Sequence, residues 1–144
     1  MDFQALKRLV QESENIVFFG GAGTSTESGI PDFRSAGGLF DEDGGIGGAF
    51  SPEEILSRGF FMSRPKDFYR FYFSKMIYRA AKPNAAHYAL AELERRGKLK
   101  AVITQNIDGL HQMAGSREVL ELHGSVHRNF CMGCGQFFGL DELL

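Results

Sequence analysis

The chain has 144 residues, of which 43% are hydrophobic and 24% charged, and this composition is typical of a soluble globular protein. Its formal net charge of −2 gives no general attraction to nucleic acid or anionic lipid, so we expect neither a direct nucleic-acid partner nor a membrane partner. The N-terminus lacks the basic start and apolar block of a signal peptide. Because two cysteines alone form no disulfide framework, we expect a cytoplasmic, reducing location.

The first half of the chain predicts helices around one buried strand and a long loop. Apolar residues at helical spacing predict a helix over residues 2–13. The run "NIVFFGG" is β-rich and ends in glycines, which predicts a buried strand entering a tight loop. The stretch that follows is rich in Gly, Ser and Asp, and such long loops are usually functional. "SPEEILS" carries a capping box with proline at the first helical position, and an aromatic helix is expected over residues 65–81.

The second half alternates helices and strands. Asn84 is expected to cap a helix that reaches about Arg96 and stops at Gly97. "KAVITQN" predicts a second buried strand, "IDGLHQMAG" a short helix, and "EVLELHG" a third strand. Strands that alternate with helices predict an α/β fold with a parallel sheet. The helical block at residues 51–82 has no strands, so we expect it to be an insertion beside the sheet.

The loop "GGAGTSTESGIPDFR" is the first candidate site. Gly21, Ala22 and Gly23 follow a predicted strand and permit close approach of a ligand to the backbone. Free N–H groups at the next helix start could hold a pyrophosphate. The dinucleotide fingerprint requires a third glycine where this chain has Thr26. The pattern therefore leaves phosphate binding and a structural turn equally open.

Two further candidate segments follow the predicted strands. In "TQNIDGLH", the amides of Gln105 and Asn106 and the carboxylate of Asp108 suit a ribose or a carboxamide, although Asp108 could simply cap the next helix. In "LELHGS", His123 lies at a strand end, where an imidazole can act as a general base near neutral pH. A single histidine in this place is more often structural. His87 is interpreted as helix surface or packing.

These segments occur in a specific order. "GAGTSTESGIPDFR", "TQNIDGLH", "LHGS" and then a CxxC pair follow one another, and in this the chain resembles the sirtuins, the NAD-dependent protein lysine deacylases. The resemblance implies an α/β fold with a Rossmann-like parallel sheet, a helical insertion and the beginning of a small zinc-binding module. It assigns residues 1–50 and 83–127 to the NAD-binding domain, 51–82 to the insertion and 128–144 to the zinc module.

The resemblance also implies the chemistry. In sirtuins the acyl-lysine oxygen displaces nicotinamide from the ribose of NAD, and a histidine then acts as base on a ribose hydroxyl. The products are the deacylated lysine, nicotinamide and O-acyl-ADP-ribose. The substrate would be an acetyl-lysine protein or peptide, and the implied catalytic residues are Asn106, Asp108 and His123. The implied cofactor-binding residues are Gly21, Ala22, Gly23, Thr24, Glu27, Asp32, Phe33, Arg34, Gln105, Asn106, Ile107, Asp108 and His123.

Cys131 and Cys134 could bind zinc, form a redox dithiol or belong to an ordinary turn. The resemblance favours structural zinc, for which they supply two of four ligands. The sequence ends ten residues after Cys134, so we expect the second ligand pair and the C-terminal strands to be absent and the activity of this chain alone to be weak. The alternatives are a non-catalytic NAD-binding or interaction fragment and an NAD-dependent protein ADP-ribosyltransferase.

Acyl preference depends on one pair of positions in the aromatic helix. Sirtuins that remove acidic acyl groups carry a Tyr-x-x-Arg pair there. An ungapped match places Phe71 and Ser74 at those positions, which offers no guanidinium to a second carboxylate. The match predicts removal of acetyl or another uncharged acyl group, whereas a different register would bring in Arg70 or Lys75.

Overall fold

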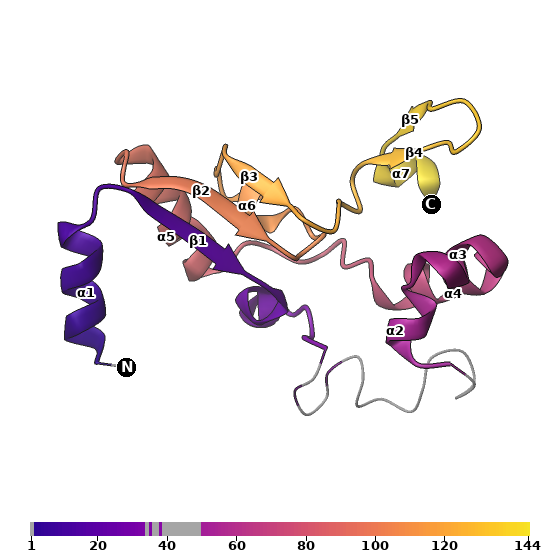
Figure 1. Ribbon diagram of the computed structural model, residues 1–144, viewed down its shortest axis with the longest axis horizontal. Coiled ribbons are helices and arrows are strands. Elements are labelled where there is room, and N and C mark those ends of the chain that lie inside the picture. The colour runs from indigo at the N-terminus through magenta and orange to yellow at the C-terminus, as the bar shows by residue number, and fades with distance from the viewer. Residues whose placement is uncertain (1, 34, 36–37, 39–49) are drawn as a thin grey trace.

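The computed structural model describes residues 2–33, 35, 38 and 50–144 (Figure 1). It begins with helix α1 (Phe3–Glu12), as predicted, and the Asp2 side chain caps this helix by accepting a hydrogen bond from the Gln4 N–H. None of the helices in the described ranges is long and apolar enough to cross a membrane.

A parallel sheet forms the centre of the fold. Strands β1 (Ile16–Gly20), β2 (Leu99–Thr104) and β3 (Val119–Glu121) lie in the order β1-β2-β3, and both pairs are parallel. The register pairs Gly20 with Thr104 and Thr104 with Glu121, so the three strands end side by side. The segments that follow these strands therefore leave the sheet at the same edge, which is where open α/β sheets bind ligands. The predicted α/β class is confirmed.

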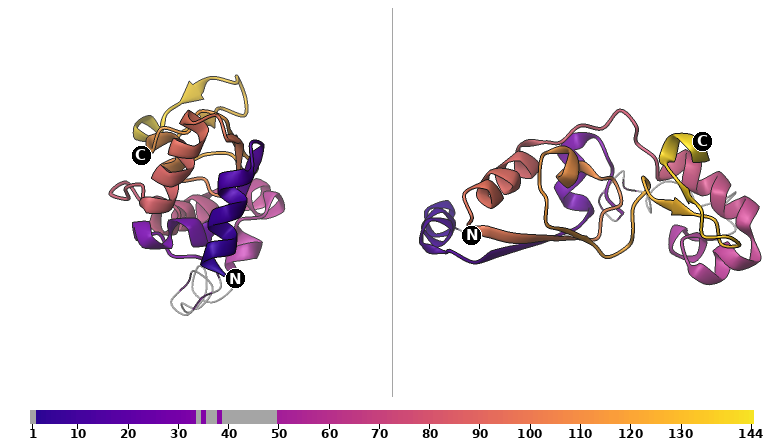
Figure 2. Two further views of the ribbon diagram at one scale, coloured as in Figure 1. Left: turned by 90° about the vertical axis from the view of Figure 1, so that its left-hand side faces the viewer. Right: turned by 90° about the horizontal axis from the view of Figure 1, so that it is seen from above.

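The two faces of the sheet differ. Helices α5 (Ala85–Arg95) and α6 (Leu110–Met113) lie on one face, as the right-hand view of Figure 2 shows. Under α5, Leu90 packs on Leu99 and Val102 to form the buried core of this part of the chain. On the other face Phe19 and Leu120 are more than half exposed, in agreement with the two-residue period of a strand.

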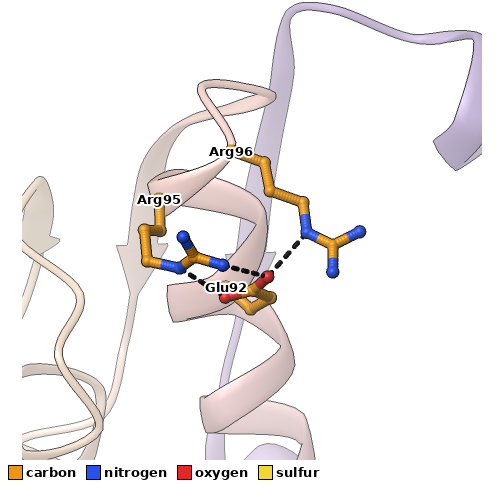
Figure 3. A network of polar contacts seen from close by, with 3 residues as sticks. All are labelled: Glu92, Arg95 and Arg96. Carbon is orange, nitrogen blue, oxygen red and sulfur yellow. Dashed lines mark hydrogen bonds and ion pairs between the residues drawn. The ribbon is translucent and has the colours of Figure 1, made fainter.

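Helix α5 has sharply defined ends. Asn84 caps its start, as predicted, and Gly97 follows its end with a φ of +76°. In its last turn the Glu92 carboxylate accepts hydrogen bonds from the guanidinium groups of Arg95 and Arg96 (Figure 3), at 2.6–2.7 Å. These contacts, the one from Arg95 foremost, lower the pKa of Glu92 to about 2. The network lies on the surface at the end of α5 that precedes β2.

The helical insertion has a small core of its own. Helices α2 (Pro52–Ile55), α3 (Arg58–Ser63) and α4 (Pro65–Lys75) enclose the buried side chains of Ile55, Phe60 and Phe71. The capping box of α2 is present as predicted. Helix α4 ends at Lys75 rather than at residue 81. Met76 packs against this core, and the chain then leaves it to return to the sheet side and enter α5, so tertiary packing overrides the helical pattern.

The C-terminal residues form a hairpin and a short helix. Strands β4 (Asn129–Phe130) and β5 (Phe137–Phe138) pair antiparallel, and helix α7 (Leu140–Leu143) follows. An ion pair of 2.7 Å between Arg79 and Asp141 connects α7 to the segment between α4 and α5. The division of the chain into an NAD-binding domain, an insertion and a zinc module stays a prediction.

Candidate functional site

A cavity of about 910 Å³ lies where the three parallel strands end. Its wall includes ten of the residues predicted to bind cofactor: Gly21, Ala22, Gly23, Asp32, Phe33, Gln105, Asn106, Ile107, Asp108 and His123. Thr24 and Glu27 are not part of this wall, and the side chain of Glu27 is exposed. Arg34 lies outside the described residues. The structure therefore gathers most of the predicted site from three distant segments.

The glycine loop forms a 3₁₀-helix, η1 (Ala22–Ser28), directly after β1. A Cβ atom on Gly21 would lie 3.4 Å from Nε2 of Gln105, so the glycine lets the two strand-end segments approach each other. Asn84 fastens the loop to the start of α5, because its side-chain amide donates to the Thr24 carbonyl at 2.8 Å and to Ser28 Oγ at 3.1 Å. The loop is thus held between β1 and α5.

A hydrogen-bond network connects the glycine loop to the segment after β2. Ser25 Oγ, which is fully buried, donates to Asp108 Oδ2 at 2.7 Å and accepts from Asn106 Nδ2 at 3.0 Å. The other carboxylate oxygen of Asp108 accepts from the Leu110 N–H at 2.9 Å. One oxygen of Asp108 therefore accepts from the first residue of α6 and the other binds Ser25, while a role of Asp108 in ligand binding stays a prediction. Ser25 was not predicted as a site residue.

His123 is oriented by a backbone carbonyl. Its Nδ1 lies 3.0 Å from the Gln105 carbonyl oxygen. Because a carbonyl oxygen can only accept, Nδ1 carries the proton in this pair, and Nε2 of the neutral ring keeps its lone pair. The ring is exposed and belongs to the cavity wall. This arrangement is the one that a general base requires.

His127 also lines the cavity, although its spacing in the sequence, four residues before Cys131, suggested at most a third zinc ligand. Its Nε2 lies 3.2 Å from the Asp108 carbonyl oxygen. Gly109 has a φ of +73°, and a Cβ atom there would lie 2.8 Å from Cδ2 of His127. Glycine is therefore required at residue 109 both by the backbone conformation and by the imidazole beside it.

Two buried histidines lie behind the network. His87 and His111 are almost completely buried, and their ring centroids are 4.7 Å apart. Of the two interpretations of His87, packing is therefore correct and helix surface is wrong. Burial lowers the pKa of both imidazoles, while the charge of Asp108 acts in the opposite direction. Burial therefore favours the neutral form of both rings.

Helix α4 supplies the opposite part of the cavity wall. Tyr72 and Lys75 are part of the wall, and the Tyr72 ring stacks on Phe68 with a centroid distance of 5.6 Å. Burial raises the pKa of Tyr72. The residues chosen by the ungapped match lie elsewhere: Phe71 is in the core of the insertion, and Ser74 Oγ donates to the Phe71 carbonyl. The match therefore did not identify the residues of α4 that face the cavity.

Cys131 and Cys134 lie in the turn between β4 and β5, and both are exposed and reduced. The turn is closed by hydrogen bonds from the Cys131 N–H to Gln136 and from the Gly135 N–H to the Cys131 carbonyl, each 2.8 Å long. The N–H groups of Cys134 and Gly133 lower the pKa of the Cys131 thiol, which favours the thiolate that metals bind. Among the described residues, no group of three or more His, Cys, Asp or Glu side chains is arranged to hold a metal.

The comparison with family models agrees with this geometry. The model of the Sir2 family matches residues 21–144. The chain belongs to the Sir2 family. This match includes the glycine loop, the segment after β2, the His123 turn and the cysteine pair.

Curated Sir2 relatives extend beyond the part that matches. A protein of Clostridium perfringens named NAD-dependent protein deacetylase is 62% identical over 133 residues, which are 92% of this chain and 54% of that protein. A protein of the same name from Clostridium acetobutylicum is 58% identical over 139 residues, or 96% of this chain and 56% of that one. The chain spans about half the length of these curated relatives.

Solved Sir2 structures have the same fold. A Sir2 variant with deacetylated p53 peptide and 3′-O-acetyl ADP-ribose is 40% identical with a TM-score of 0.87, covering 99% of this chain and 55% of that one. A Sir2 protein bound to acetylated peptide is 39% identical with a TM-score of 0.79, and the match covers 99% of this chain and 53% of that one. The Rossmann-like fold that the resemblance implied is therefore confirmed.

Proposed function

We propose that this chain carries the catalytic residues of an NAD-dependent protein lysine deacetylase. The observation that supports this most directly is the cavity that gathers the glycine loop, Asp108 and His123 from three strand ends. Relatives at 58–62% identity are named NAD-dependent protein deacetylase. Because the chain spans about half of those proteins, the activity of the whole protein is a proposal here.

The cavity suits NAD on chemical grounds. The backbone of residues 21–23 lies at the cavity wall without large side chains, which suits the close approach of a pyrophosphate. Phe33 on the same wall supplies an apolar ring that could exclude water from the reacting ribose. Mutants of a Sir2 homologue have been solved as complexes with ADP-ribose, a part of NAD. When bound, NAD supplies the ribose carbon from which nicotinamide departs.

The side chains at the strand ends then have distinct roles. Asn106 and Asp108 are held by Ser25, so their remaining polar atoms are oriented before a ligand arrives. His123, with Nδ1 donating to the Gln105 carbonyl, keeps Nε2 available to take a proton from a ribose hydroxyl. These roles correspond to the predicted catalytic set of Asn106, Asp108 and His123.

The proposed substrate is an acetyl-lysine peptide, as bound in one of the similar structures. The acyl preference is tested by measuring the rates of deacylation of an acetyl-lysine and a succinyl-lysine peptide under the same conditions. We expect acetyl to be removed faster. Faster removal of succinyl would overturn the proposed preference.

We also propose that Cys131 and Cys134 supply two thiolates to a structural zinc site. Their exposed thiols and the closed turn suit one edge of a tetrahedral sulfur site, which needs two more ligands. The zinc would stabilise the β4-β5 turn and take no part in the reaction. The cytoplasmic location also stays a prediction.

One assay distinguishes the proposed function from its alternatives. The chain is incubated with NAD and an acetyl-lysine peptide, and nicotinamide, deacetylated peptide and protein-bound ADP-ribose are measured together. Deacetylation that requires NAD supports the proposal. ADP-ribose transfer without deacetylation indicates a transferase, and the absence of all three products indicates a non-catalytic fragment.

A further inference from the structure

A buried carboxylate lies at the end of β3, directly before the turn that carries His123. The side chain of Glu121 is only 3% exposed. Both of its oxygens have partners: Oε2 lies 2.5 Å from Arg128 Nη2, and Oε1 accepts from Gln112 Nε2 at 2.9 Å. A buried charge is tolerated only when it is paired and hydrogen-bonded in this way. The pairing itself joins three segments of the chain.

The two partners come from different segments of the chain. Arg128 follows the His123 turn, so its ion pair with Glu121 joins the two ends of the segment 121–128. Gln112 lies on α6, the helix whose first residue, Leu110, donates its N–H to Asp108. Glu121 therefore connects the beginning and the end of the His123 turn with the helix that follows Asp108.

Two backbone hydrogen bonds hold the His123 turn along the segment after β2. The Leu122 N–H donates to the Thr104 carbonyl at 2.9 Å, and the Val126 N–H donates to the Ile107 carbonyl at 3.0 Å. Between these bonds Gly124 has a φ of +78°, which reverses the chain directly after His123. The hydrogen bond from Nδ1 to the Gln105 carbonyl fixes the tautomer of the exposed imidazole. Nδ1 of His123 can reach the Gln105 carbonyl only while the His123 turn stays aligned with the segment after β2.

We infer that Glu121 is a positioning residue for His123, which acts through Arg128 and Gln112 to hold the His123 turn against residues 104–108. The carboxylate does not reach the reacting atoms, because both of its oxygens are already bound by protein groups. Its loss would let the turn shift and the Nδ1 hydrogen bond break. The consequence for turnover rests on the proposed deacetylase function, whereas the consequence for the imidazole does not.

The test follows the tautomer of His123 by long-range ¹H–¹⁵N NMR on the full chain at pH 8. In the wild type we expect a proton on Nδ1 and an unprotonated Nε2. Glu121→Gln preserves the shape of the side chain and its contact with Gln112 but removes the charge. In this variant we expect His123 ring-nitrogen signals averaged between the two tautomers. Glu118→Gln makes the same charge change at an exposed residue near the start of β3 and should match the wild type.

A second pair of variants covers the case in which Glu121→Gln fails to fold. Arg128 is 51% exposed, so Arg128→Met removes the partner of Glu121 without opening a cavity, and Arg128→Lys restores a charge. We expect Arg128→Met to give averaged tautomers and Arg128→Lys to recover part of the wild-type signal. A folded Arg128→Met or Glu121→Gln with the wild-type tautomer overturns the inference, and so does a wild type without the Nδ1 proton.

Turnover gives a second readout. If Glu121 positions a base, Glu121→Gln should lower the rate of deacetylation by about 10- to 100-fold, with the KM for NAD changed by less than about threefold. A general loss of structure would instead affect both. A wild type with the expected tautomer but without any NAD-dependent turnover would contradict the proposed function and leave the positioning role supported.

Discussion

Ser25 and Asp108 are 83 positions apart in the sequence and share a hydrogen bond of 2.7 Å between Oγ and Oδ2. This bond joins the loop after β1 to the segment after β2 at the cavity. Because Ser25 also accepts from Asn106, one hydroxyl orients two of the side chains that we assign to the reaction. Substitutions at this point are therefore expected to affect binding and stability together.

Ser25→Ala should weaken both properties. The change removes the donor to Asp108 and the acceptor for Asn106, and an unsatisfied buried group costs about 1–3 kcal/mol. We expect a loss of this size in urea denaturation and a kcat/KM for NAD lowered at least about tenfold. Thr26→Ala is the control, since its exposed hydroxyl donates to the Gly23 carbonyl. Equal effects of the two changes would contradict the role of Ser25.

Gly109→Ala should destabilise the chain and displace His127. Left-handed backbone costs an alanine about 1–2 kcal/mol, and the new methyl group would also meet the imidazole 2.8 Å away. Gly97 is the matched control, since its φ is +76° and a methyl group added there would have no neighbour within 4 Å. Denaturation should show a larger loss for Gly109→Ala than for Gly97→Ala. Equal losses would mean that the contact with His127 has no energetic importance.

Stability should fall on mild acidification. The pKa values of His87 and His111 are lowered in the folded chain, so below the unfolded value of about 6.5 the unfolded chain binds more protons. Stability is therefore fully present above that pH and is lost as the pH falls from about 6.5, at up to about 1.4 kcal/mol per pH unit for each histidine. The nearby charge of Asp108 reduces this loss.

Urea denaturation between pH 7 and pH 5 measures this dependence. His111→Leu should reduce the slope, because one titrating ring is removed. Glu92→Gln is the control: its carboxyl titrates between its ordinary value of 4.5 and about 2, so the variant should keep the wild-type slope above pH 5. A wild type whose stability is constant from pH 6.5 to pH 5 would contradict the assignment of two neutral buried rings.

The cysteine pair can be tested by metal content. If Cys131 and Cys134 hold zinc, the purified chain should contain metal that Cys131→Ser removes, and a chelator should lower the melting temperature of the wild type. Cys134→Ser should behave in the same way. A wild type that contains no zinc after expression in zinc-supplemented medium, with a melting temperature insensitive to chelator, would contradict the zinc proposal.

Much of the site could be predicted from the sequence because parallel strands place their carboxyl ends together. Gln105, Asn106, Asp108 and His123 each follow an apolar run, and all four line the cavity. The bond between Ser25 and Asp108 could not be predicted, because no local pattern pairs residues from separate strand ends. His127 was missed because a single histidine on an irregular segment has no periodic signal.

Other differences also arise from tertiary packing. The aromatic run after Pro65 continues its helical pattern beyond Lys75, yet the chain must leave the insertion to enter α5. The choice of Phe71 and Ser74 failed for a related reason, since a one-residue change of position on a helix turns a side chain by about 100°. Tyr72 and Lys75 face the cavity instead.

The most direct test of the proposed function is the deacetylation of an acetyl-lysine peptide by the full chain, with and without NAD, compared with His123→Ala. The proposed roles predict NAD-dependent formation of deacetylated peptide above background by the wild type and its loss in His123→Ala, whose circular dichroism should match the wild type. Deacetylation that does not require NAD, no deacetylation by the wild type, or an unchanged rate in His123→Ala would contradict the proposal.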